Sequence, residues 1–189
     1  MKPKENILIQ ARDIVIPRVE SLSKDVKYCV LQNEGQEGWP APLPALLYCF
    51  ATIDLLAALY DGNAESFGTI SKRAKSYMTH VMNYSEDVAT LLQEVFRHKI
   101  VHLAQLQPKV TLDQKVYTWR YYHCDRAQHL TVVELDKAAF LYEFRVSIWS
   151  LAEDIANSVT APGGYLDRLN QRESLRKNFE IAHAQIFTP

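Results

Sequence analysis

Three side chains able to bind phosphate or transfer a proton lie close together in the apolar stretch 85–107: Arg97, His98 and His102. An arginine can hold a phosphate diester through two N–H groups, and a histidine can move a proton near neutral pH. These residue types are therefore typical of a site that handles a phosphodiester. A solvated helix face with incidental histidines would give the same spacing, so the pattern leaves both interpretations open.

The stretch that carries these side chains is predicted to be one helix. Ser85 can cap its N-terminus, and Pro108 ends it. Glu94, His98 and His102 are four residues apart and share one face, beside the long stem of Arg97. Apolar residues at helical spacing predict a stripe that faces the core: Val88, Leu91, Leu92, Val95, Phe96, Ile100, Leu103 and Leu106.

The segment FRHKIVH resembles the signature of the HEPN superfamily, in which Arg, a polar residue and then His lie on an apolar helix. The earlier stretch ALLYCFATIDLLAALYDG also resembles uncharacterised bacterial proteins of this superfamily, so the resemblance covers residues 44–107. It implies a small antiparallel α-helical bundle that usually dimerises, with the two motif copies meeting at the interface. It also implies a metal-independent endoribonuclease or, where activity has been lost, a binding or assembly module.

The resemblance assigns a role to each motif residue. Arg97 and His102 are the expected catalytic pair, and His98 is the polar companion, at a position where the family most often has Asn. RNA would supply its 2′-hydroxyl as nucleophile, His102 would transfer a proton, and Arg97 would stabilise charge on the phosphate. We therefore expect a homodimer, RNA or a nucleotide as ligand, and no cofactor. Members that act as toxins would also have an antitoxin-like partner protein.

A carboxylate on the most apolar helix is expected to support this site. Residues 45–60 are apolar nearly all round and predict a buried helix. Asp54 lies within it, and a buried carboxylate needs a partner. The partner could be a local hydrogen bond within the bundle, or else Arg97 or His102, which Asp54 would then orient. Glu94 is a second candidate for a supporting role.

Residues 65–83 predict another helix, and it carries a basic cluster of Lys72, Arg73 and Lys75. Such a cluster is usually only a solvated face. It could instead form a rim that receives the RNA backbone.

The hydrophobic period changes from helical to alternating at residues 116–134. VYTWRYYH and HLTVVE each alternate in the manner of a strand, which predicts a β-hairpin inserted between helices. Its aromatic residues, interleaved with Arg120, could stack RNA bases. Alternatively, the rings cover the helical body.

The remaining patterns predict helices at 4–31, 135–159 and 165–183, with Pro17 expected to kink or divide the first of them. Residues 32–44 have the composition of a loop. The predicted fold class is mainly α: a HEPN-like antiparallel helical bundle with an inserted β-hairpin at about 116–134, in a single domain 1–189.

Composition narrows the functional classes. The chain has 189 residues, 48% of them hydrophobic, and a formal net charge of −1. No global positive field therefore attracts nucleic acid or an anionic membrane, although a local basic site remains compatible with this charge. Three scattered cysteines fit a reducing cytoplasm. A charged N-terminus and the interruption of the longest apolar run by Asp54 predict a cytoplasmic protein without a membrane segment.

A metal site is the remaining alternative for the motif helix. Two histidines at positions i and i+4, here His98 and His102, can ligate one ion. Glu94 lies on the same face, but three ligands from one helix face cannot all reach one ion without distortion. A further ligand would have to come from elsewhere in the chain or from a partner, and the expectation for this site is no metal.

Overall fold

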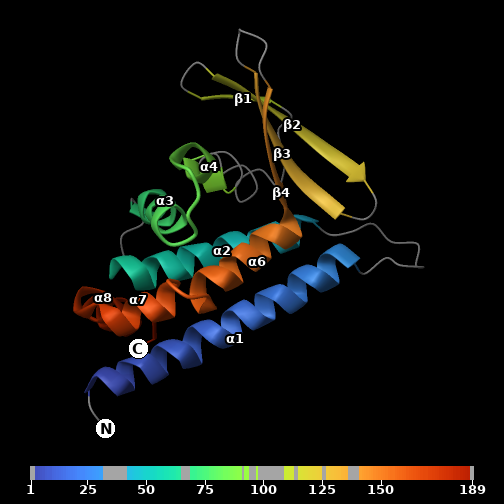
Figure 1. Ribbon diagram of the computed structural model, residues 1–189. Helices are drawn as coiled ribbons and strands as arrows, with labels where there is room; N and C mark the ends of the chain where they lie inside the picture. The colour runs from blue at the N-terminus through green and yellow to red at the C-terminus, as the bar shows by residue number, and fades with distance from the viewer. Residues whose placement is uncertain are drawn as a thin grey trace.

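Seven helices and four strands are placed by the computed structural model, which describes residues 3–31, 42–64, 69–90, 92–93, 97, 109–112, 115–124, 127–135 and 141–187 (Figure 1). In chain order they are α1 (Pro3–Leu31), α2 (Pro42–Asp61), α3 (Ile70–His80), α4 (Glu86–Thr90), β1 (Lys109–Leu112), β2 (Lys115–Cys124), β3 (Ala127–Leu135), β4 (Leu141–Ser147), α6 (Ile148–Thr160), α7 (Tyr165–Gln171) and α8 (Glu173–Phe187). The described chain is therefore mainly helical, as the sequence predicts.

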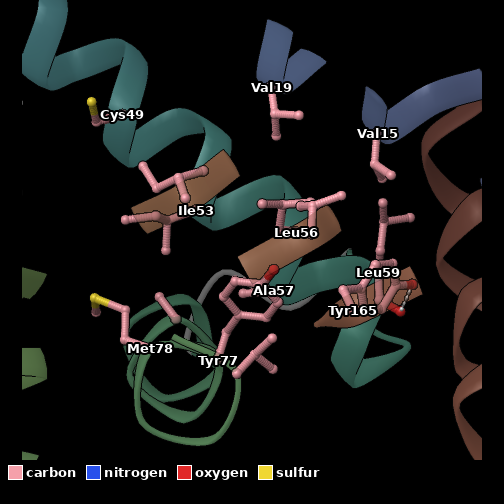
Figure 2. Close-up of a cluster of buried hydrophobic side chains, with 14 of the residues drawn as sticks. Val15, Val19, Cys49, Ile53, Leu56, Ala57, Leu59, Tyr77, Met78 and Tyr165 are labelled. Carbon is pink, nitrogen blue, oxygen red and sulfur yellow. Dashed lines mark hydrogen bonds between the residues drawn. The ribbon is translucent and has the colours of Figure 1, made fainter. Parts of the chain in front are cut away.

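The helix α2 lies at the centre of the bundle, in contact with α1, α3, α6 and α8. Its side chains meet Val15 and Val19 of α1 on one side and Tyr77 and Met78 of α3 on the other (Figure 2). By length and composition alone, Pro44–Asp61 could cross a membrane. However, 56% of this window is buried inside the protein, which is the pattern of a core helix. The prediction of a buried helix at 45–60 is confirmed.

Buried hydroxyl groups connect the helices around α2. The Tyr77 hydroxyl lies 3.0 Å from Ser158 Oγ, which donates to the Ile155 carbonyl at 2.7 Å. Tyr165 donates to the Leu59 carbonyl at 3.3 Å, and burial raises the pKa of both tyrosines. These phenols therefore stay protonated and satisfy polar groups that would otherwise be unpaired inside the core.

Pro17 does not divide the first helix, so of the two predicted effects, a kink or a division, the division is wrong. α1 runs through it as one helix of 29 residues. Pro17 lies on the exposed side, where solvent can satisfy the carbonyl that loses its helical partner. Packing of the opposite side holds the helix together through Ala11, Val15, Val19, Leu22 and Val26, all of which are buried.

The segment between the predicted hairpin and the C-terminal helices differs from the prediction. Residues 141–147, predicted as helix, form the strand β4, and α6 begins at Ile148. The sequence LYEFRVS alternates in a strand-like manner, and its pairing with β3 overrides the helical pattern that follows it. The predicted helix 165–183 is also two helices, because Arg172 is extended (ψ 119°) between α7 and α8.

The four strands form one antiparallel sheet in the order β1-β2-β3-β4, and β4 continues directly into α6 (Figure 1). β2 and β3 are its central pair, in a register that runs from Val116 opposite Leu135 to Cys124 opposite Ala127. A separate two-stranded hairpin inserted between helices, as predicted for 116–134, is therefore not supported. The strand β1 pairs with β2 on one side and β4 pairs with β3 on the other, and the sequence pattern predicts neither β1 nor β4.

Gly62 and Gly163 provide a matched test of how tightly α8 packs on the turn after α2. Both have positive φ, 81° and 76°, so alanine should cost about 1 kcal/mol at either position. At Gly62 a Cβ would also lie 2.9 Å from the Asn178 Cα, whereas at Gly163 it would meet nothing within 4 Å. We expect Gly62→Ala to lower the unfolding free energy by about 1–3 kcal/mol more than Gly163→Ala in urea titrations. Equal losses would contradict close packing at this turn.

Candidate functional site

The segment that carries the motif begins as predicted. The backbone N–H of Val88 donates to Ser85 Oγ at 3.3 Å, so Ser85 caps α4. Leu92, Gln93 and Arg97, further along, have π-helical hydrogen bonding. A π-helical turn inside a helix is rare and frequently marks a functional position. Gln93 and Arg97 are four residues apart, so they lie near the same side of this segment.

Arg97 forms an ion pair with Asp54 of α2. Its Nη2 and Nε donate to Asp54 Oδ2 at 2.8 and 3.2 Å, and the two side chains are 20% and 21% exposed. Asp54 Oδ1 is buried and has no hydrogen-bond partner within the described chain. The predicted pairing of Asp54 with Arg97 is therefore confirmed. His102, the other predicted partner, lies outside the described residues.

Burial outweighs the attraction of Arg97 in setting the pKa of Asp54. Loss of solvation raises that pKa, while the charge and hydrogen bonds of Arg97 lower it, as do smaller effects of Arg73 and Gln93. The net shift is upward, so this carboxyl keeps its proton to a higher pH than an aspartic acid in water. Its ionised form depends on the positive groups around it.

Arg73 belongs to the interior of this cluster and not to an exposed rim. Its side chain is buried, and Nη1 donates to the Asn63 carbonyl at 2.7 Å. Its positive charge also acts on Asp54. Arg73 is therefore not part of an exposed rim, and its proposed contact with RNA stays a prediction, whereas Lys72 is exposed and Lys75 is half-buried.

Gln93 is a member of the cluster that the sequence analysis missed. Its side chain is 1% exposed, and neither its amide oxygen nor its amide nitrogen has a hydrogen-bond partner in the described structure. The sequence did hold a signal, because Gln93 is a polar residue four positions before Arg97, among apolar neighbours. The predicted site was instead placed on the adjacent face, which carries Glu94, His98 and His102.

Several predicted site residues are not placed by the structure. Glu94, His98 and His102 lie outside the described residues, so their roles stay predictions, as does a metal site built from them. Arg120 lies in β2 opposite Thr131 of β3, and its proposed contact with RNA is also untested. Within the described chain, no group of three His, Cys, Asp or Glu residues is placed to hold a metal ion.

Comparison with protein-family models found no match to this chain. Searches of curated proteins and of solved structures likewise found no similar sequence and no similar fold.

Changing Asp54 to Asn tests whether burial of the Asp54 carboxyl outweighs its attraction to Arg97 in setting the Asp54 pKa. Because the folded-state pKa is raised, the stability associated with the protonated carboxyl is present at low pH and is lost as pH rises through the raised pKa. We expect the unfolding free energy of the unaltered protein minus that of Asp54→Asn to fall as pH rises through the raised Asp54 pKa. Above that pH the difference should level off. Urea titrations at a series of pH values measure this, with the exposed Asp61→Asn on the same helix as control. A difference that grows with pH would show that Arg97 dominates.

Proposed function

We propose that this protein is a metal-independent endoribonuclease of HEPN type, in which Arg97 binds the scissile phosphate and His102 transfers a proton. The observation that supports this proposal is the way Asp54 holds Arg97. The carboxylate occupies the Nε edge of the guanidinium, and Nη1 makes no hydrogen bond with any described residue. The described residues thus leave the rest of this planar donor group available to a ligand.

A guanidinium held in this way is suited to a phosphate ester. Arginine has five N–H donors in a rigid plane, and two of them can bind two phosphate oxygens in parallel. The ion pair with Asp54 restricts the side chain before a ligand arrives, which lowers the entropic cost of binding. With 20% of its side chain exposed, Arg97 is reachable from solvent while most of it is held in place.

The local charge favours an anion although the chain as a whole does not. Asp54, Arg73 and Arg97 bring one carboxylate and two guanidinium groups together, so this cluster is positive while the whole chain has a formal net charge of −1. A single phosphate group would therefore be attracted here without a general attraction of polyanions. Exposed Lys72 on α3 is a candidate for further contact with the RNA backbone.

The proposed reaction needs no metal ion. The RNA 2′-hydroxyl attacks the adjacent phosphorus, and the 5′-oxygen leaves, giving a 2′,3′-cyclic phosphate. His102 takes the hydroxyl proton or protonates the leaving oxygen, and Arg97 stabilises the charge that develops on the phosphate. His98 and Glu94 are proposed to support His102. One motif supplies few groups, so we propose that two copies meet across a cytoplasmic homodimer, with an antitoxin-like partner where the protein acts as a toxin.

A second candidate function uses the same anion site without cleavage. The protein would then be a binding module in which Arg97 holds the phosphate of a nucleotide or stabilises a protein interface. The formal net charge of −1 favours this alternative, because proteins that process long nucleic acids usually carry an extended basic surface. Only a measurement of cleavage distinguishes the two functions.

Arg97→Lys, Arg97→Ala and His102→Ala test the proposed site. Lysine keeps the positive charge but loses the planar donor pair, so we expect all three variants to lose about 10²- to 10³-fold in cleavage of single-stranded RNA in the presence of EDTA. Arg12→Ala is the matched control, since Arg12 is exposed on α1 and forms no ion pair with any described residue. Circular dichroism confirms that each variant is folded.

The outcomes separate the two functions. Cleavage by the unaltered protein that disappears in folded Arg97→Lys supports the nuclease. Equal cleavage by the variants rejects it. If the unaltered protein is a dimer that binds a nucleotide through Arg97 but leaves RNA intact, the non-catalytic module is the correct function.

A further inference from the structure

Gln93 carries buried hydrogen-bonding groups that its surroundings do not satisfy. Its side chain is 1% exposed, and both polar atoms of its amide lack a hydrogen-bond partner within the described residues. A buried amide in this condition costs roughly 1–3 kcal/mol for each unpaired group. An apolar side chain of similar size would avoid that cost, so a glutamine at this position calls for a reason beyond packing.

Asp54 also has a buried hydrogen-bonding atom without a partner among the described residues. Asp54 Oδ2 accepts both bonds from Arg97, whereas Oδ1 is buried without a partner. The Gln93 amide favours the ionised form of this carboxyl as a hydrogen-bond donor would, although neither amide atom reaches hydrogen-bond geometry with Oδ1 in the present arrangement. The terminal torsion of a glutamine is soft, so a small rotation can turn its N–H toward Oδ1.

We infer that Gln93 is a positioning residue that donates to Asp54 Oδ1, so that Gln93 and Arg97 hold the two oxygens of one carboxylate from the same helical segment. The two residues are four positions apart, on a π-helical stretch that faces α2. Arg97 is then fixed through Asp54, and Asp54 through Gln93. This inference rests on the proposed role of Arg97 in phosphate binding.

The charges that face Asp54 from the described elements are Arg97 on the same segment as Gln93 and Arg73 on α3. Both guanidinium groups favour the carboxylate, and burial opposes it. A neutral donor on Oδ1 shifts this balance toward the ionised form without adding a charge that would compete for the phosphate. An amide therefore suits this position better than a further lysine or arginine would.

Gln93→Met tests the inference, because methionine fills a similar volume without an amide. We expect the pKa of Asp54, followed by ¹³C NMR of the side-chain carboxyl in the full-length protein, to rise further in this variant. Inorganic phosphate should bind about tenfold more weakly near neutral pH, with the acidic limb of its binding curve moved to higher pH. Thr52→Val is the matched control, since Thr52 is fully buried on α2 and donates to the Tyr48 carbonyl of its own helix.

The same titration separates this inference from the proposed function, because it is done without RNA. A raised Asp54 pKa in Gln93→Met together with intact RNA supports the positioning role and rejects the nuclease. An unchanged Asp54 pKa in folded Gln93→Met overturns the positioning role whatever the RNA assay shows. If Gln93→Met does not fold, Gln93→Glu decides the matter: two coupled carboxyl titrations support proximity to Oδ1, and an unchanged Asp54 curve overturns it.

Discussion

The organisation of this protein depends on one carboxylate placed where solvation is poor. Asp54 lies on the most apolar helix of the bundle, and burial shifts its pKa upward despite a guanidinium 2.8 Å away. A buried ion pair of this kind contributes little net stability, because desolvation offsets the attraction. Its main effect is to specify where the two side chains lie relative to each other. Only an arrangement that brings positive or donating groups to Asp54 allows the carboxyl to ionise, and this favours the placement of Arg97 against α2.

The bundle supplies the rigidity that such a pair needs. α2 is enclosed by α1, α3, α6 and α8, and buried phenols on α3 and α7 form hydrogen bonds with Ser158 and the Leu59 carbonyl. A helix held on several sides cannot easily shift to relieve the cost at Asp54. Arg97, which reaches Asp54 from the partner segment, has π-helical hydrogen bonding, as do Leu92 and Gln93.

The sequence predicted the features that depend on local pattern and missed those that depend on tertiary contact. Helix α2, the Ser85 cap and the need of Asp54 for a partner follow from periodicity, capping chemistry and the cost of burying charge. The sequence leaves three candidates for that partner, a local hydrogen bond, Arg97 or His102, and the structure shows Arg97. Arg73 was misplaced because a cluster of basic residues in sequence does not reveal which member turns inward. β4 was missed because its alternation is only seven residues long and merges into a strong helical pattern.

The burial of Arg73 also changes the expected character of the proposed anion site at Arg97. As a surface residue it would contribute to a broad basic face, and affinity for nucleic acid would then depend on many weak contacts screened by salt. As an interior residue it strengthens the field at one carboxylate, which in turn fixes one guanidinium. Positive charge is thereby concentrated at one guanidinium that is only 20% exposed, in a chain with a formal net charge of −1. If Arg97 binds phosphate as proposed, such an arrangement would discriminate by geometry, because the phosphate must meet the edge of the guanidinium that the described residues leave open.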